Sequence, residues 1–502
     1  MTNTARPFNL VDDPWIPAGS ELISLREAFS RENPNLAGTP MEKIALLKLL
    51  LAVAQSACTP EDDAAWEALG PDGLAAACSA YLEAHRDAFY LYGKMPFLQF
   101  PQINRANVQP LGALLPHVAT GNTTILQDLQ KERPLSDAEK ALLLVCVSGF
   151  ALGGKKADNT VVLTSGYTEK SKEGGKGVSG KAGAWLGSAG YLHHFLCGEN
   201  LLQTIWMNLL THEDIRHLSV FREGLGTAPW ERMPEGEACP TALKLRESLM
   251  GRLVPLSKFC LLDGDGMHYT DGIAHAAPND GGVDPSTAVL RDASSVRCLW
   301  TNPDRQPWRN LDALLAFLGG HAGFDCPGIR ACLARAVRNV PAVGLWAGGL
   351  RVSSNAGEQY VSGGDDFVDG LIFLPADATG EFWYHALQSE MDALNALGRQ
   401  VYAVTAAYHA STVQKHDAGA GKDKGEGDKA ARRATQIFWE LCGRESQTLI
   451  DLCADAERIP ELRRRFAAFA LRAYNAVCPR DTARQLESWA ENRPKTGKYC
   501  NA

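Results

Sequence analysis

From residue 379 onward, apolar side chains recur every three, four or seven residues, the spacing of one face of an α-helix. Four such stretches follow one another, so residues 379–502 are predicted to form a C-terminal four-helix bundle. Residues 416–429 carry no apolar side chain larger than alanine and are predicted to be a disordered connection between two helices. The apolar positions that mark the helices are Leu387, Met391, Leu394, Val401, Val404, Tyr408, Ile437, Leu441, Leu462, Phe466, Phe469, Ala473, Val477, Leu486 and Trp489.

The first three quarters of the chain show a different pattern. Two capping boxes, Thr39 with Glu42 and Ser136 with Glu139, predict helix starts, and the first is followed by an apolar run typical of a buried helix. From about 200 to 375, short apolar runs alternate with Gly, Pro and Asp turns. Residues 1–378 are therefore predicted to form a large mixed domain with irregular loops, and the fold class to be α+β.

Composition narrows the possible functions. The chain has 502 residues, 45% of them apolar, which is enough for two or three domains. Its net charge of -8 means that any nucleic acid must meet a local basic patch. The 13 cysteines are scattered with no CxxC pair, so we expect reduced thiols and no metal site. With no signal core and no membrane-length apolar run, we expect a cytoplasmic protein without membrane contact.

Residues 153–190 stand out from this acidic background. They hold ten glycines, and six lysines against three acids. This composition predicts a long loop, or two loops around a short strand at Val161–Leu163.

Within this region, GGKGVSGKAG (residues 174–183) is one residue short of a nucleotide-binding P-loop. Ala182 stands where the Mg²⁺-binding hydroxyl belongs, and no buried strand precedes the glycines, so an NTPase is disfavoured. A solvated loop with no role stays open. The interpretation we favour is contact between backbone, lysine and polynucleotide phosphate. We call residues 172–181 the glycine/lysine segment. Its candidate contact residues are Lys172, Gly174, Gly175, Lys176, Gly177, Ser179, Gly180 and Lys181.

Other chemistry finds little support. HExxH, GxSxG and DxDxDG are all missing, so we predict no catalytic residues and no cofactor. Adjacent His193 and His194 lie in an apolar run and favour a structural role. Between Arg458 and Lys498, ten Arg and Lys residues stand against four acids, which indicates either a solvated helix face or a surface for an anionic partner. The glycines and small polar residues of 348–357 predict a flexible turn or hairpin.

Several of these pieces together resemble the CasA family, the large subunit of the type I-E CRISPR surveillance complex Cascade. The opening FNLVDDPWIP is similar to that family's N-terminal signature. The same order follows in the chain: an apolar helix, PFLQF at Pro96–Phe100, the glycine/lysine segment, a GG-x-R turn, and a bundle ending in AVCPRDTARQLESWAENR.

The resemblance implies a non-catalytic subunit that recognises the protospacer-adjacent motif (PAM) of foreign duplex DNA from the minor groove. It also implies a role in duplex opening and R-loop formation. The implied partners are the other Cascade proteins, the 5′ end of the guide RNA, target DNA and a recruited helicase-nuclease. The alternatives are a P-loop-like nucleotide-binding enzyme and a purely structural nucleic-acid-binding subunit.

By position, the resemblance places the family's groove-contacting glycine at Gly175. It places a DNA wedge at residues 351–356, which we call the wedge segment, and a guide-RNA contact near residues 124–128. The family's motif-reading lysine has no counterpart, because the region near His268 to Ala277 contains no lysine. The implied wedge residues are Arg351, Ser354, Asn355 and Ala356, and the implied RNA-contacting residues are Thr124, Ile125 and Gln127.

Overall fold

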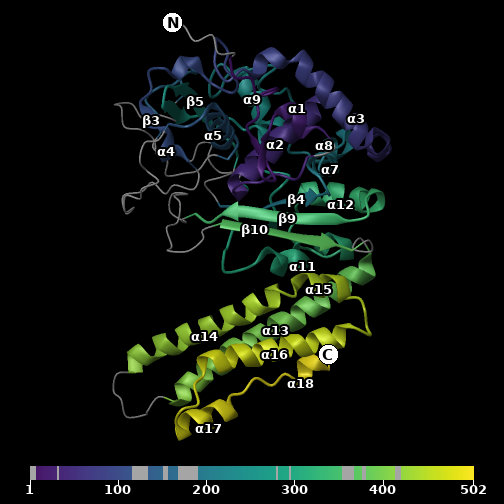
Figure 1. The fold of residues 1–502 in the computed structure, drawn as a ribbon, viewed down its shortest axis with the longest axis vertical. Helices are drawn as coiled ribbons and strands as arrows, with labels where there is room; N and C mark the ends of the chain where they lie inside the picture. Colours follow the sequence, from purple (N-terminus) through teal and green to yellow (C-terminus); the bar gives the residue numbers. More distant parts are fainter. Residues whose placement is uncertain are drawn as a thin grey trace. The chain divides into compact units, whose positions relative to one another are not determined.

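The structure is a computed structural model (Figure 1). It describes residues 7–30, 33–115, 134–150, 157–167, 190–276, 278, 281–292, 295–352, 367–375, 380–412 and 420–501, the side chains of 420–424 excepted. The chain divides into two compact units, Met1–Pro303 with Phe324–Leu371, and Asp304–Gly323 with Ile372–Ala502. The domain boundary predicted at residue 379 stays a prediction.

In the first unit, helix α2 packs against α3, α5, α7 and α10 and is buried on nearly all sides, as its apolar run predicted. Both predicted capping boxes are confirmed, at Thr39 before α2 and at Ser136 before α5. The helices are α1 (Leu25–Ala28), α2 (Pro40–Ala57), α3 (Asp63–Ala84), α4 (Leu111–Leu114), α5 (Asp137–Gly149), α7 (Leu201–Met207), α8 (His212–His217), α9 (Pro240–Arg246), α10 (Met250–Leu253) and α12 (Pro327–Asn339).

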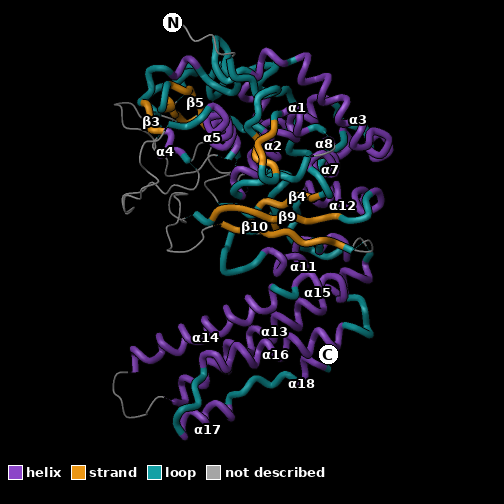
Figure 2. Tube along the Cα trace, in the orientation of Figure 1, coloured by secondary structure: helices purple, strands orange, loops and turns teal. Residues whose placement is uncertain are grey.

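Small antiparallel sheets complete this unit, shown as separate orange segments in Figure 2. One has the strand order β10-β9-β4 and another β3-β6-β5, while β1 pairs with β2 and β7 with β8. The mixed helix-and-sheet fold predicted from the sequence is confirmed. The strands are β1 (Ile16–Ala18), β2 (Glu21–Ile23), β3 (Val108–Pro110), β4 (His193–Cys197), β5 (Lys258–Asp263), β6 (Gly266–Asp271), β7 (Val289–Arg291), β8 (Val296–Cys298), β9 (Val343–Leu350) and β10 (Phe367–Leu374).

The predicted strand at Val161–Leu163 is wrong. These residues are half-buried and have no strand pairing. The backbone N–H groups of Leu163 and Thr164 donate instead to the carboxylate of buried Glu237, at 3.1 and 2.8 Å. A side-chain acceptor thus replaces the strand partner that the apolar residues suggested.

The second unit is helical in the described residues. Helix α13 packs along both α14 and α16. The predicted apolar seam of α13 is buried except at Val404, which is partly buried, and buried Glu390 pairs with Arg463 across the α13–α16 contact. The α-helices are α11 (Leu311–Leu314), α13 (Glu381–Thr412), α14 (Ala420–Gly443), α15 (Ser446–Leu452), α16 (Ile459–Val477), α17 (Ala483–Glu491) and α18 (Gly497–Cys500).

The disordered connection predicted at 416–429 is wrong from residue 420 onward, because α14 already begins at Ala420. Two contacts with α13 account for the early start. Tyr402 donates a hydrogen bond to Asp428, and a Cβ atom on Gly427 would lie only 3.4 Å from that of His409. Glycine therefore lets the two helices approach closely, which composition alone does not show. Residues 413–419 lie outside the described part.

Candidate nucleic-acid interface

Strands β4 and β9 bring two distant parts of the chain together. They pair antiparallel, with His193 opposite Gly348 and Cys197 opposite Gly344. A chain that runs antiparallel enters one strand at the end where it leaves the other. The segment that precedes β4 and the segment that follows β9 therefore meet at the same end of this strand pair.

Gly190 marks this meeting point. A Cβ atom built there would lie 2.8 Å from Cγ2 of Val352 and 3.0 Å from the carbonyl oxygen of Leu350. Its φ of +67° is also in the left-handed region that favours glycine. Residues 168–189, which contain the glycine/lysine segment, end beside Gly190, and residues 353–366, which contain most of the wedge segment, begin beside Val352.

Of the turn or hairpin predicted at 348–357, the turn is wrong for the first three residues, because Gly348, Gly349 and Leu350 belong to β9. A hairpin is not contradicted, since β9 and the next strand, β10, are neighbours in one sheet. A Cβ atom on Gly348 would lie 2.3 Å from the Trp346 ring, and one on Gly349 would lie 2.2 Å from Oγ1 of Thr301. The glycines therefore serve close packing within a strand rather than a flexible turn.

A second contact fixes Gly190 from the other side. The N–H of Thr301 donates to the Gly190 carbonyl at 2.8 Å, and the Thr301 hydroxyl donates to the Tyr191 carbonyl at 3.2 Å. The rings of Tyr191 and Trp300 lie 5.0 Å apart. Gly190, nine residues after the glycine/lysine segment, is thus held by β9 and by residues 300–301.

The chain that leads to the glycine/lysine segment is held in place at Asp158 and Asn159. The N–H of Asp158 donates to the Tyr269 carbonyl at 2.8 Å, and the Asn159 side chain donates to Asp271 at 2.6 Å. Asp271 ends β6 and also accepts a hydrogen bond from buried Lys258. Lys258 belongs to β5 and is committed to this internal pair, so it is not a free counterpart of the family's motif-reading lysine.

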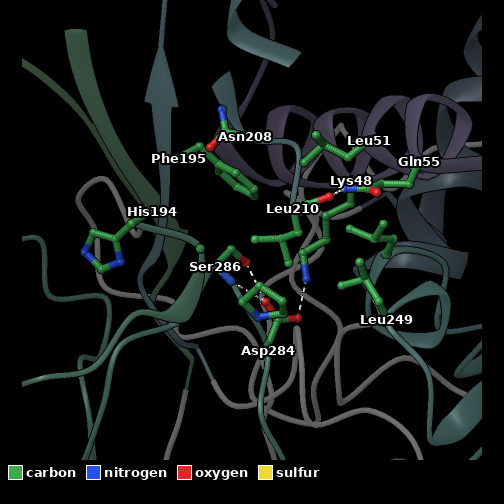
Figure 3. A pocket seen from close by; sticks show the side chains of 13 residues that line it. Lys48, Leu51, Gln55, His194, Phe195, Asn208, Leu210, Leu249, Asp284 and Ser286 are labelled. Atoms are coloured by element: carbon green, nitrogen blue, oxygen red, sulfur yellow. Dashed lines mark hydrogen bonds and ion pairs between the residues drawn. The ribbon is translucent and has the colours of Figure 1, made fainter. Parts of the chain in front are cut away.

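A buried polar network supports β4. Lys48 of α2 pairs with Asp284, and their side chains are 2% and 0% exposed. Ser286 donates to Asp284 at 2.6 Å (Figure 3). Its hydroxyl also lies 2.9 Å from Nδ1 of His193. The network links α2, β4 and the chain before β7.

This network is not arranged as a catalytic centre. The cavity beside it has a volume of only about 30 Å³, the room of roughly one water molecule. Burial lowers the pKa of His194 to about 4, so this histidine is neutral near pH 7. In the described residues, no three His, Cys, Asp or Glu side chains group as metal ligands. The pair His193–His194 packs and hydrogen-bonds within the core.

A family model described as CRISPR-associated protein Cse1 matches residues 9–476. The chain belongs to the Cse1 family, also called CasA. The resemblance to CasA seen in the sequence is confirmed.

Known Cse1 proteins share both sequence and fold with this chain. CRISPR-associated protein CasA/Cse1 of Thermus thermophilus is 30% identical over 341 residues, which cover 62% of this chain and 61% of that protein. A crystal structure of Thermus thermophilus CasA superposes with a TM-score of 0.72 at 19% identity, covering 99% of this chain and 100% of that one.

A chain solved within a CRISPR RNA-guided surveillance complex superposes with a TM-score of 0.67 at 16% identity, covering 97% of this chain and 99% of that one. At these identities the structural matches show a shared fold. The sequence match spans about three fifths of its relative.

Most of the site residues predicted for this Cse1-family chain lie outside the described residues. These are the whole glycine/lysine segment, Ser354, Asn355 and Ala356 of the wedge segment, and the RNA-contacting residues Thr124, Ile125 and Gln127. Arg351 is described, half-buried, directly after β9. What the structure adds is that Gly190, nine residues after the glycine/lysine segment in the chain, lies against Val352 of the wedge segment.

Several basic side chains between Arg458 and Lys498 form contacts within the second unit. Arg463 pairs with Glu390, Arg465 pairs with Glu461, and Arg480 and Arg493 lie 4.8 and 5.5 Å from the Trp489 ring centre. Much of this charge therefore stabilises the helical unit. Among the helices that the structure describes, in this unit and in the other, none is long and apolar enough to cross a membrane.

Proposed function

We propose that this Cse1-family chain is the non-catalytic large subunit of a type I-E Cascade complex. It recognises the PAM of foreign duplex DNA from the minor groove, aids duplex opening and R-loop formation, and recruits the helicase-nuclease. Its membership of the Cse1 family supports this function. The fold that it shares with a chain of an RNA-guided surveillance complex supports it as well.

The observation that carries the proposal is the close approach of Gly190 to Leu350 and Val352. Reading a minor groove requires small groups and close backbone approach, which Gly175 and its neighbours supply. Holding a duplex open requires a second group, the wedge, beside the backbone that reads the minor groove. Asn355 can serve as that group, because the wedge segment begins against Gly190, nine residues after the glycine/lysine segment.

The remaining assignments follow from the same proposal. Residues 124–127 contact the 5′ end of the guide RNA, and the other Cascade proteins are partners. Residues 379–502 form a four-helix bundle domain built on α13, α14, α16 and α17, and residues 1–378 form a domain that binds nucleic acid. The chain uses no cofactor and acts in the cytoplasm.

Replacing both Asn355 and Ala356 by glycine tests the wedge. We expect slower and less complete R-loop formation on an intact target duplex, because unstacking one base step costs on the order of a few kcal/mol. On a target that is mismatched next to the PAM, the variant complex should form R-loops nearly as well as wild type, because the bases there are already unpaired. R-loop formation is measured on both substrates by permanganate reactivity of the displaced strand.

The change removes no charge, so the defect should be largely independent of salt. Equal loss on intact and mismatched targets would show that these residues act in folding or general binding. Duplex binding that ignores the PAM altogether, in wild type and variant alike, would favour a purely structural subunit.

A further inference from the structure

A pocket of about 750 Å³ lies in the first unit, away from the strand pair β4–β9. It is formed by the chain after α8, the end of α9, α10, and the residues between β6 and β7. Among the described residues that line it, four are arginines and one, Glu247, is an acid. The arginines are Arg222, Arg246, Arg252 and Arg291.

The pocket carries an excess of three positive charges in a chain whose net charge is -8. Burial lowers the pKa of Arg252 to about 10, so its guanidinium stays charged near neutral pH. His275 adds no charge, because burial and then the charge of Arg252 lower its pKa to about 3. The imidazole Nδ1 accepts from Arg252 at 2.9 Å, and Nε2 donates to the Pro255 carbonyl at 2.7 Å.

The four arginines fall into two pairs. Arg252 is fixed by His275, and Arg291 donates to the carbonyls of Pro278 and Gly282 at 2.7 and 2.9 Å. The side chains of Arg222 and Arg246, by contrast, form no hydrogen bond or ion pair with any residue that the structure describes. Two guanidinium groups are thus held rigidly, and two remain available to a ligand.

The chain offsets the charge of these arginines only in part. Burial lowers the pKa of Arg252, and the nearby carboxylate of Asp284 opposes that shift. Arg246 lies close enough to Arg252 to lower the pKa of that guanidinium by repulsion. Glu247 follows Arg246 directly in the chain, and among the described residues it forms no ion pair with a pocket arginine. Guanidinium forks match the geometry of phosphate oxygens and form paired hydrogen bonds with them.

The pocket is connected to the interface through the β7–β8 hairpin. Arg291 ends β7 and lies opposite Val296 of β8. The N–H of Leu299 donates to the Ala288 carbonyl at 3.0 Å, and the N–H of Leu192 donates to the Leu299 carbonyl at 2.9 Å. Leu192 is two residues from Gly190, so a short run of backbone hydrogen bonds joins the pocket to the chain at Gly190, nine residues after the glycine/lysine segment.

We propose that this arginine pocket binds a backbone phosphate of the target DNA, close to the PAM. The inference rests on the proposed function, because it takes DNA to lie along the glycine/lysine segment. A phosphate there would be held between the fixed pair Arg252 and Arg291 and the available pair Arg222 and Arg246. The contact adds affinity and register but reads no base.

The test replaces Arg222 and Arg246 by alanine in the assembled complex. Each phosphate contact contributes about 0.9 to the log–log slope of affinity against salt, so losing one contact should lower that slope by about one unit. Affinity for target duplex at low salt should fall by about tenfold or more. The matched control replaces Arg216 and Arg338, two exposed arginines of the same unit, and should leave the slope unchanged.

A second variant guards against a folding defect. Glu247→Gln removes the one acid of the described lining and should tighten duplex binding several-fold at low salt, an effect that misfolding cannot imitate. Loss of guide-RNA retention with an unchanged DNA slope would overturn the proposal by assigning the phosphate to RNA. An unchanged slope and unchanged Glu247→Gln affinity would overturn it outright.

A variant with alanine at Lys172, Lys176 and Lys181, called the lysine variant and measured in parallel, separates this inference from the proposed function. If the lysine variant loses slope and the arginine variant does not, the pocket proposal fails alone. If neither variant changes the slope, both proposals fail.

Discussion

Complexes carrying alanine at Lys172, Lys176 and Lys181 should bind target duplex much more weakly than wild type. Their log–log salt slope should be smaller by up to about three units, because each lysine that leaves a phosphate no longer releases a counterion. Among the variants proposed for this chain, we expect this one to lose the most affinity for duplex DNA between low and moderate salt. Equilibrium binding of a PAM-containing duplex, titrated over a range of salt concentrations, measures it.

Gly175→Asp is the companion variant. It adds bulk and a negative charge where the backbone must approach phosphate, so it should weaken binding more than any single lysine substitution. If the triple variant keeps the wild-type slope of affinity against salt, the glycine/lysine segment does not contact DNA phosphates. ATP turnover by the purified chain that disappeared in Lys181→Ala would revive the nucleotide-binding alternative.

Local signals in the sequence were sufficient for much of the helical structure. The capping boxes at Thr39 and Ser136 use residues three positions apart, and the α13 seam repeats within one helix, so no distant contact is needed to recognise either. Predictions from composition were wrong where contacts with distant residues determine the structure. Gly427 allows α14 to approach α13, and Gly349 allows β9 to pass Thr301, and in both cases the partner lies outside the local sequence.

The candidate sites divide in the same way. The glycine/lysine segment is conspicuous because its lysines and glycines are neighbours in the chain. The arginine pocket is assembled from Arg222, Arg246, Arg252 and Arg291, which span about seventy residues and sit in ordinary local sequence. No periodicity or motif links them, so only the fold brings them together. The adjacency of Gly190 and Val352 likewise required the strand register.

The buried pair Lys48–Asp284 should be the most sensitive point of the scaffold under the interface. Lys48→Met leaves the Asp284 carboxylate buried without its counter-charge, which typically costs about 3–5 kcal/mol. Urea unfolding of the purified chain measures the change in the free energy of unfolding. The double variant Lys48→Met with Asp284→Asn should recover most of the loss, because no unpaired charge is left in the core.

The pH dependence of unfolding distinguishes the loss of a charge pair from a simple packing defect, because only the charge pair makes the destabilisation depend on pH. Burial alone would raise the pKa of Asp284, but the charge and hydrogen bond of Lys48, with Ser286, lower it to about 2. The wild-type pair therefore contributes stability above the unfolded pKa of about 3.9, and this contribution is lost as the pH falls towards 2. In Lys48→Met, burial is no longer opposed by the lysine and the pKa of Asp284 should rise, so acidification should narrow the stability gap to wild type. If the gap stays constant from pH 7 down to pH 3, Lys48 contributes by packing and not by charge.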